Sequence, residues 1–468
     1  MSGALGPEYT IVLGVFATMI MVMLAKNRTI LAYWAALAAV VVSGVWTIIL
    51  WSDRALPLSL YAQGVTVDGF SLVINGLVLL ASAGALLIGW NDERYGADFP
   101  ALVLLALLGM MVLGLANNFL VLFLGIELLS LPLYILAASG GYAESREAGL
   151  KYLLLGAFSS GILLFGLALL YGASGTMVFT QLGNSPLILP LAGAGLALTV
   201  VGLVFKLGII PFHMWVPDVY EGSPLPVTSY MAFGTKVAAA AVLLRFLFFG
   251  FSLAVGWWEP ALGYLAVLTM VAGNLLALAQ KDMKRLLAYS GIANAGYVLV
   301  GISAHNQSGA RAMLFYLLVY GLAVLAAFAV FTMVAGDRKS VSLNDLTGLA
   351  RRSPWLTAFL TVAMLSLAGI PLTGGFVGKF YLLQAALYAN EPGLAIGLVV
   401  GAMIGLAAYV RPLQRAFQAG DGAVVPIRWP IAGAVVVIIA VLGTIGLGVY
   451  PAPIVHIVNH SAAFDWLH

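Results

Sequence analysis

Long apolar runs dominate the chain and recur at short intervals from one end to the other. A transmembrane helix needs about 20 consecutive, predominantly apolar residues to cross a bilayer. Such runs occupy fourteen stretches: 8–25, 30–51, 69–90, 100–115, 118–139, 148–171, 187–211, 225–250, 253–279, 286–304, 308–335, 355–388, 393–418 and 430–451. The pattern predicts an all-α polytopic membrane protein with about fourteen transmembrane helices, in which Asn117 and Asn118 mark the turn between the fourth and the fifth.

The composition agrees with this class. Hydrophobic residues make up 62% of the 468 residues, charged residues make up 8%, and the mean hydropathy is +1.06. A membrane β-barrel is excluded because its strands alternate apolar and polar positions, whereas these runs are continuous. The absence of cysteine excludes disulfides, thiolate-bound iron–sulfur clusters and cysteine-based zinc sites. Lys26 and Arg28 follow the first apolar run instead of preceding it, so we expect a retained helix and not a signal peptide.

Basic residues are distributed unevenly between the two sets of loops. One set holds fifteen lysines and arginines, whereas the other holds only Arg54 and Arg311. The fifteen are Lys26, Arg28, Arg94, Arg146, Lys151, Lys281, Lys284, Arg285, Arg338, Lys339, Arg351, Arg352, Arg411, Arg415 and Arg428. Because cytoplasmic loops carry an excess of lysine and arginine, we expect the basic side to be cytoplasmic and both termini to be periplasmic in a bacterial plasma membrane.

Predicted helices four to eight and nine to thirteen form two blocks of five. An odd number of helices means that the second block enters the membrane in the opposite orientation, as in an inverted repeat. The fourth helix of each block carries a similar break, Gly208-Ile209-Ile210-Pro211 in the first and Gly369-Ile370-Pro371 in the second. We therefore expect two inverted five-helix repeats with discontinuous helices 7 and 12. The expected segments are 1–99 (three N-terminal helices), 100–250 (first repeat), 251–420 (second repeat) and 421–468 (helix 14 and tail).

Lys206 and Lys379 lie within apolar runs, close to these breaks. A basic side chain at the centre of a membrane helix costs about 2.5–3.5 kcal/mol on insertion scales, so we expect it to have a role. Burial disfavours the charged form of an amine, which makes both lysines candidate proton carriers. The alternative is a lysine that extends to the lipid headgroups. This alternative is weaker for Lys206 than for Lys379, because the glycines beside Lys379 leave its depth open.

Glu127 is the only carboxylate in its predicted helix. A buried carboxylate is either protonated or paired with a cation, so we expect an ion pair with Lys206 whose strength changes as protons pass. A static pair that only locks two helices together is the alternative. Lys236 stands between the two lysine-bearing broken helices in chain order and is expected to be an intermediate carrier. Arg245 is expected to anchor its helix or to extend to the surface.

The residues after the first break place His, Asp and Glu at the basic side. His213 titrates near neutrality and could pass protons between this side and Lys206. Asp218 and Glu221 either attract cations or act as ordinary solvated loop residues. Their spacing in a proline-rich loop does not favour a metal site with His213. Lys151 is either the first proton carrier at this side or an interface anchor.

The chain has no recognisable nucleotide-binding motif. The sequence at 375–379 ends in Gly-Lys but lacks the spacing of a phosphate loop, and no GxGxxG follows a predicted strand. We therefore expect neither ATP nor a nicotinamide nucleotide to bind, so that energy must come from an ion gradient or a neighbouring subunit.

Four segments carry a family resemblance. They are EAGLKYLLLGAFSSG (147–161), KLGIIPFHMWVPDVYEGSPLPVTSYMAFGTK (206–236), QKDMKRLLAYSGIANAGY (280–297) and LSLAGIPLTGGFVGKF (365–380). Together they resemble the antiporter-like membrane subunits of the proton-pumping NADH-quinone oxidoreductase, respiratory complex I, and most of all the subunit N family. The resemblance covers about residues 8 to 451.

The resemblance implies fourteen helices and a hydrated polar axis at mid-membrane. By position, the family's proton-relay residues correspond to Glu127 in helix five, Lys206 in helix seven, Lys236 in helix eight and Lys379 in helix twelve, with less defined roles for Lys151 and His213. The resemblance also implies that NADH, FMN, iron–sulfur clusters and quinone are bound by other subunits, and that this chain holds no cofactor and no metal. The implied partners are the other membrane subunits of the complex and the lipid bilayer, without nucleic acid.

Two other classes remain open. One is a subunit of a sodium/proton antiporter, whose D-type subunit is related to this family and would exchange sodium for protons without NADH. The other is a structural membrane subunit with fixed ion pairs. Only about 17 residues follow the last predicted helix, so we do not expect the long lateral helix of the largest antiporter-like subunit.

Overall fold

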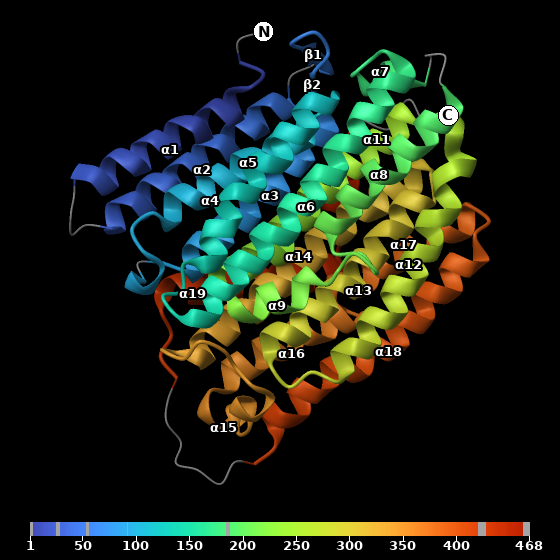
Figure 1. Ribbon diagram of the computed structural model, residues 1–468. Helices are drawn as coiled ribbons and strands as arrows, with labels where there is room; N and C mark the ends of the chain where they lie inside the picture. The colour runs from blue at the N-terminus through green and yellow to red at the C-terminus, as the bar shows by residue number, and fades with distance from the viewer. Residues whose placement is uncertain are drawn as a thin grey trace.

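The fold is a bundle of long helices that run between two opposite ends (Figure 1). The computed structural model describes residues 3–24, 29–52, 56–90, 92–183, 188–419 and 427–461. Lys26, Arg28 and Arg54, which contributed to the predicted sidedness, lie outside the described residues. Helices dominate because every backbone N–H and C=O group in hydrocarbon needs a partner within the protein.

Three helices precede the two repeats. They are α1 (Gly6–Leu24), α2 (Thr29–Trp51) and α3 (Gly69–Ile88). A short antiparallel hairpin, β1 (Leu58–Leu60) and β2 (Val65–Val67), joins α2 to α3 and pairs Leu58 with Val67. Figure 1 places this hairpin at the same end of the bundle as the start of α1.

Each repeat contains five membrane-crossing units. The first comprises α4 (Phe99–Leu115), α5 (Phe119–Ala138), α6 (Ala143–Ser174), α8 (Leu189–Leu207) with α9 (Trp215–Gly222), and α10 (Leu225–Tyr230) continued by the π-helical turn η2 (Met231–Thr235) and α11 (Lys236–Gly250). The second comprises α12 (Val255–Leu278), α13 (Met283–Ser303), α14 (Gln307–Ala335), α16 (Pro354–Ala368) with α17 (Gly374–Tyr388), and α18 (Pro392–Phe417). After them come α19 (Ile431–Val449) and α20 (Ala452–Asn459).

Short helices lie in the connections. These are η1 (Glu93–Tyr95), α7 (Phe179–Leu182), η3 (Ser252–Ala254), η4 (Leu343–Leu346) and α15 (Leu349–Arg352). Among the described residues, twelve helices are long and apolar enough to cross a membrane. Two shorter apolar helices, α4 and the first half of the α16–α17 unit, bring the crossing units to fourteen. The predicted number of transmembrane helices is confirmed.

Two matching β-bridges display the inverted repeat. Asn118, before α5, pairs with Val178, which follows α6; Asp282, before α13, pairs with Ser342, which follows α14. The first bridge lies beside the β1–β2 hairpin, where Asn117 N donates to the Gly64 carbonyl at 3.1 Å. The second lies among the basic loops at the other end. The same local structure therefore occurs once at each end of the bundle, as an inverted repeat requires.

Both discontinuous helices end in the same backbone motif. Gly208 after α8 has φ 78° and Gly369 after α16 has φ 84°, a left-handed conformation that suits glycine. Ile209 N and Ile370 N each donate to a carbonyl five residues back at 3.0 Å. This Schellman motif closes each half-helix, and the predicted breaks in helices 7 and 12 are confirmed.

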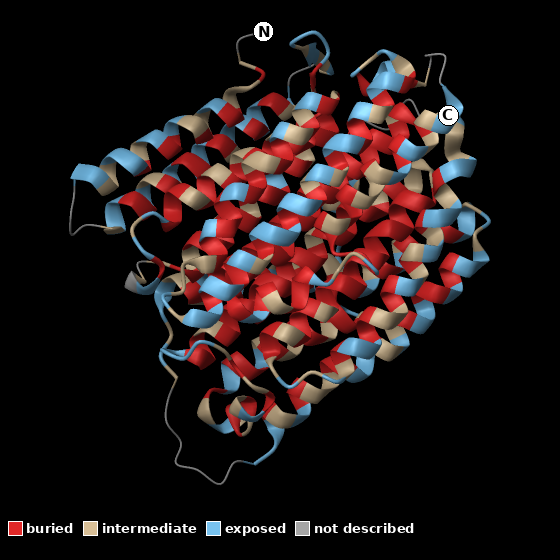
Figure 2. Ribbon diagram, in the orientation of Figure 1, coloured by how far each residue is buried: buried red, intermediate tan, exposed pale blue. Residues whose placement is uncertain are grey.

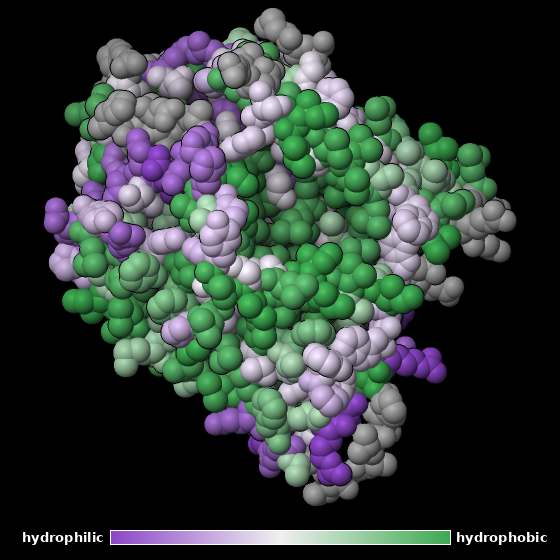
Figure 3. All heavy atoms as spheres, turned by 180° about the vertical axis from the view of Figure 1, so that it is seen from behind, coloured by the Kyte–Doolittle hydropathy of each residue, from purple (hydrophilic) through white to green (hydrophobic). Residues whose placement is uncertain are grey.

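The most buried helices lie at the centre of the bundle (Figure 2). In the spans formed by α10–α11 and by α13, 94% of the residues in an apolar 18-residue stretch are buried inside the protein. In α1, α2, α6 and α19 the corresponding share is 33%. Figure 2 shows exposed stripes along the outward faces of α1, α6 and α18. On the back face, hydrophobic residues cover the middle and hydrophilic residues gather toward two opposite ends (Figure 3). The outer helices therefore present an apolar belt to lipid.

Arg245 anchors its helix and does not extend to the surface. Its side chain is only 1% exposed and forms an ion pair with Asp68 at 2.5 Å, which agrees with the first of the two expected roles and not with the second. Asp68 also accepts a hydrogen bond from Ser71 N and caps α3. The guanidinium lies 5.0 Å from the centre of the Phe70 ring. This pair attaches α11 to the start of α3.

Replacing Arg245 is expected to destabilise the bundle. Arg245→Ala leaves the Asp68 carboxylate buried without its cation, which costs about 3–5 kcal/mol. Equilibrium unfolding of the purified chain in detergent measures this loss. Lys281→Ala, which removes an exposed lysine side chain, is the control and should change little. Equal stability of the two variants would contradict the assignment of a stabilising ion pair.

Candidate functional site

Lys206 lies near the C-terminal end of α8 and points into the bundle. It is one of three buried lysines in the two broken-helix regions, with exposed fractions of 4% for Lys206, 2% for Lys236 and 7% for Lys379. The Lys206 amine donates to Ser130 Oγ at 2.8 Å and to the Tyr152 hydroxyl at 3.0 Å. The amines of all three lysines bind groups inside the bundle.

Glu127 lies one turn before Ser130 on α5, close to Lys206 but not in direct contact with it. Among the ion pairs between described residues, none joins Glu127 to Lys206, so the expected direct pair is not formed. Glu127 Oε1 is buried without a hydrogen-bond partner. Ser130 is therefore the group that links Lys206 to the helix of Glu127.

Lys236 closes the end of the first broken helix. It is the first residue of α11, directly after the π-helical turn, and its amine donates to the Leu207 carbonyl at 2.9 Å. Leu207 is the last residue of α8. The last carbonyls of a helix lack partners and carry a partial negative charge, which favours a cation there.

Lys379 makes the equivalent contact in the second repeat. Its amine donates to the Leu367 carbonyl at 2.8 Å and to the Ala368 carbonyl at 3.1 Å, at the end of α16. The amine also lies 4.7 Å from the centre of the Tyr297 ring. Each break is thus closed by one buried lysine, which comes from the next helix in the first repeat and from the second half-helix in the second.

Uncharged polar residues of α13 and its neighbours fill the space between Lys236 and Lys379. Asn294 Nδ2 donates to the Tyr409 hydroxyl at 3.2 Å, and Ser290 Oγ lies 2.7 Å from the same hydroxyl. The Tyr316 hydroxyl donates to Asn294 Oδ1. Tyr316 also packs edge-on against Tyr297, with ring centres 5.9 Å apart. These side chains lead from the middle of α13 to the ring beneath Lys379.

Tyr320 extends this network toward Lys236. Its hydroxyl is buried and has no hydrogen-bond partner among the described residues. A Cβ placed on Gly291 would lie 3.1 Å from the Tyr320 hydroxyl and 3.3 Å from Lys236 Cε. The hydroxyl and the lysine therefore flank the same glycine. Together the charged and uncharged groups form a buried polar row across both repeats.

Sequence reasoning missed these uncharged members because none of them is charged. The available signal was the spacing of Ser290, Asn294 and Tyr297 on α13, which places three polar groups on neighbouring turns of one helix. That segment contributed only to the family resemblance. The partners on α14 and α18 gave no comparable signal.

Lys151 lies outside the buried row, at the basic end of the bundle. Its half-exposed amine contacts Glu147 at 2.8 Å and Asp218 at 3.1 Å. Arg285 bridges Asp218 and Glu221 at 2.9 and 2.6 Å. Lys151 and the three carboxylates line a cavity of about 350 Å³. Lys151 thus belongs to a mixed-charge cluster on the basic face.

His213 lies in the turn between α8 and α9. This turn lies between the two ends of the bundle in Figure 1. Its neighbours Pro211 and Met214 are exposed, whereas its Nδ1 is buried without a partner. No hydrogen bond among the described residues joins His213 to Lys206. Within the described part of the chain, no group of three or more His, Cys, Asp or Glu residues is placed to hold a metal ion.

Comparisons with known proteins identify a matching family and several related proteins. The family described as NADH:quinone oxidoreductase/Mrp antiporter, TM matches residues 116–405. The NADH-quinone oxidoreductase subunit N of Gemmatimonas aurantiaca is 39% identical over 453 residues, which cover 93% of this chain and 86% of that protein. The subunit N of Desulforamulus reducens is 37% identical over 456 residues, which cover 94% and 93%.

Solved structures agree with these relatives. A chain of respiratory complex I from Thermus thermophilus, solved with bound aureothin, superimposes with a TM-score of 0.84 at 35% identity and covers 96% of this chain and 98% of its own length. A chain of the Mrp complex from Dietzia sp. superimposes with a TM-score of 0.87 at 21% identity, covering 98% and 96%. At that identity the second match shows the fold alone.

The network around Asn294 is expected to stabilise the centre of the bundle. Tyr409→Phe removes the hydroxyl that Ser290 and Asn294 share, and a buried polar group left without its partner costs about 1–3 kcal/mol. Thermal unfolding in detergent measures the loss. Tyr264→Phe removes a hydroxyl from a tyrosine that is 79% exposed and should leave the midpoint unchanged. Two equal midpoints would mean that the network is not formed.

Proposed function

Because the chain belongs to the NADH:quinone oxidoreductase/Mrp antiporter membrane family, we propose that it acts as subunit N of a proton-pumping NADH-quinone oxidoreductase. Relatives with that name cover more than nine-tenths of the chain. The chain is an integral, multi-pass membrane protein that works with the other membrane subunits of the complex. NADH, FMN, iron–sulfur clusters and quinone belong to other subunits in this proposal, and this chain holds no cofactor.

The buried polar row supports a role in proton transfer. Lysine amines can hold and release protons, and tyrosine and serine hydroxyls both donate and accept hydrogen bonds. Glu127 and Lys206 begin the row, Lys236 and Tyr320 continue it, and Lys379 ends it. The observation that carries the proposal is the burial of three lysines at the two helix breaks, where their amines bind groups inside the bundle.

In this proposal, the charge of Glu127 influences the protonation of Lys206, which lets the row respond to neighbouring subunits. A positive charge on Lys206 is favoured by the nearby Glu127 carboxylate and disfavoured by burial. Withdrawal of the Glu127 charge would therefore promote release of a proton from Lys206 toward Lys236. Because Ser130 and not Glu127 contacts the amine, the coupling can change without breaking a direct ion pair.

The orientation in the membrane follows from the charges. The described part of the basic face brings together Lys151, Arg285 and Lys339, and cytoplasmic loops carry such an excess. We place this face in the cytoplasm of a bacterium, with both termini in the periplasm. The cluster around Lys151 then becomes the site of proton uptake. The segments 1–99, 100–250, 251–420 and 421–468 remain our proposed division into N-terminal helices, two repeats and a C-terminal part.

Removal of Lys206 is expected to abolish proton pumping by this subunit. In membranes that contain the whole assembly, Lys206→Met should strongly reduce NADH-driven proton uptake while the NADH dehydrogenase activity of the peripheral subunits survives. The same assay on Lys281→Met, which replaces an exposed lysine, should match the unmodified protein. Full pumping by Lys206→Met would favour a purely structural subunit. Sodium-dependent proton exchange without NADH would favour an antiporter.

The charge at the second break is expected to matter more than the shape of its side chain. Lys379→Arg keeps a cation that can donate to the α16 carbonyls, whereas Lys379→Ala removes it. We expect the arginine variant to retain more NADH-driven proton uptake than the alanine variant. Equal loss in both would show that the position needs a group that releases its proton, because arginine stays charged.

A further inference from the structure

A large groove separates the N-terminal helices from the second repeat at the basic end of the bundle. Its walls come from α2 and the end of α3 on one side and from α14 and the start of α19 on the other. The groove encloses about 1150 Å³. Pockets for small ligands usually enclose about 300–1,000 Å³. The buried polar row does not contribute to its lining.

The walls of the groove are apolar and aromatic. Leu37 and Trp34 of α2, Leu87 of α3 and Val435 of α19 line it. Trp34 and Trp90 pack edge to face, with ring centres 5.0 Å apart. Tryptophans gather at the headgroup level of a membrane. The walls thus offer a surface for hydrocarbon chains, with an aromatic rim at the depth of lipid headgroups.

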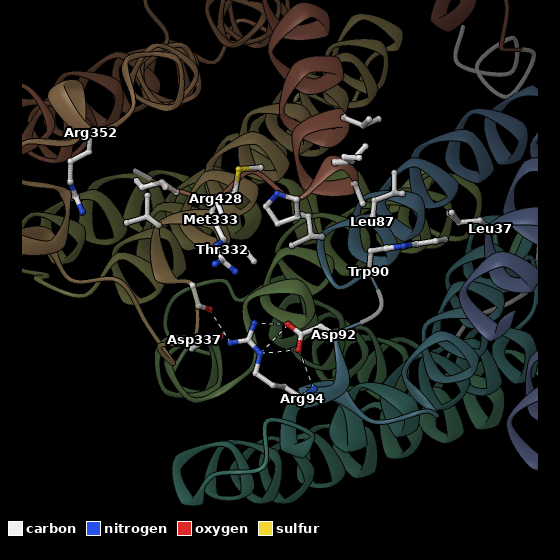
Figure 4. A pocket seen from close by; sticks show the side chains of 18 of the residues that line it. Leu37, Leu87, Trp90, Asp92, Arg94, Thr332, Met333, Asp337, Arg352 and Arg428 are labelled. Carbon is white, nitrogen blue, oxygen red and sulfur yellow. Dashed lines mark hydrogen bonds and ion pairs between the residues drawn. The ribbon is translucent and has the colours of Figure 1, made fainter. Parts of the chain in front are cut away.

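The basic rim of the groove carries arginines whose N–H donors are not all hydrogen-bonded to protein groups. The charged lining residues are Arg94, Arg352 and Arg428 against Asp92 and Asp337, a net charge of +1 from three cations and two anions. Arg94 donates hydrogen bonds to the Asp92 carboxylate and to the Gly336 carbonyl, so Asp92 is already paired with a cation. Figure 4 shows the Arg428 side chain directed toward this Arg94–Asp92 pair.

Two of the arginines retain free donors. Arg428 is exposed and has no hydrogen bond or ion pair among the described residues. Arg352 gives one hydrogen bond to the Asp345 carbonyl through Nη2, and its Nε is buried without a partner. Guanidinium groups bind phosphate oxygens through paired hydrogen bonds. The rim therefore suits a phosphate group, which neutralises the surplus positive charge.

We propose that the groove between α2–α3 and α14–α19 binds an anionic phospholipid, with its phosphate at Arg352 and Arg428 and its acyl chains along the apolar walls. An apolar helix of a neighbouring subunit would fill the walls but would leave these arginines without an anion. Basic pockets between membrane helices on the cytoplasmic side are suited to anionic headgroups. The lipid would fill the space between the three N-terminal helices and the repeats.

Lipid binding by the assembled complex tests this proposal. The complex is delipidated in detergent and titrated with phosphatidylglycerol or, for comparison, phosphatidylcholine, and its unfolding midpoint is followed. A ligand that binds only the folded state raises that midpoint. The Arg352→Gln/Arg428→Gln variant should need about a hundredfold more phosphatidylglycerol for the same rise, because each of the two charged hydrogen bonds is worth about one order of magnitude in affinity.

Matched variants separate binding from folding. Lys281→Gln/Arg351→Gln removes two exposed charges outside the groove and should behave like the unmodified complex. Arg428→Gln alone removes a side chain that forms no hydrogen bond or ion pair with the described residues, so it should fold normally and still weaken the response. Mass spectrometry should find less co-purified anionic lipid in both groove variants. Equal responses to both lipids, equal responses of all variants, or a density map with a partner helix in the groove would overturn the proposal.

Discussion

A lysine amine bound to the carbonyl end of a broken helix is the interaction on which this structure depends. A helix that ends inside a membrane exposes carbonyl groups without partners, and a buried ammonium group lacks water. Each is costly by itself. At Lys236 with Leu207, and at Lys379 with Leu367 and Ala368, each satisfies the other. The break and the charge are therefore stable together and would be unstable apart.

The two repeats use this interaction in different ways. Their backbones match at the helix breaks and at the β-bridges, yet the first repeat takes its closing lysine from the following helix, whereas the second takes it from its own second half-helix. The first repeat also carries an additional lysine, Lys206, before its break. The charged groups consequently do not form two equivalent sites, and α13 lies beside both Lys236 and Lys379.

Much of this arrangement could be predicted from sequence, since hydropathy identifies charges inside apolar runs, and a glycine followed closely by a proline identifies each helix break. The contact partners could not. Arg245 meets Asp68 from 177 residues away, and hydropathy does not disclose which face of a helix meets which neighbour. An ion pair between Glu127 and Lys206 was expected, but Ser130, one turn further along α5, takes the contact with the amine. His213 lies in the turn after the first helix break, and its expected role between the basic side and Lys206 stays a prediction.

A cryo-electron microscopy map of the assembled complex that resolves ordered water tests the central claim most directly. The account predicts that the Lys236 and Lys379 amines remain at the carbonyl ends of α8 and α16, with water joining the Tyr320 hydroxyl to its polar neighbours. A map with both amines turned toward the headgroups, and with dry aliphatic packing around α13, would contradict it.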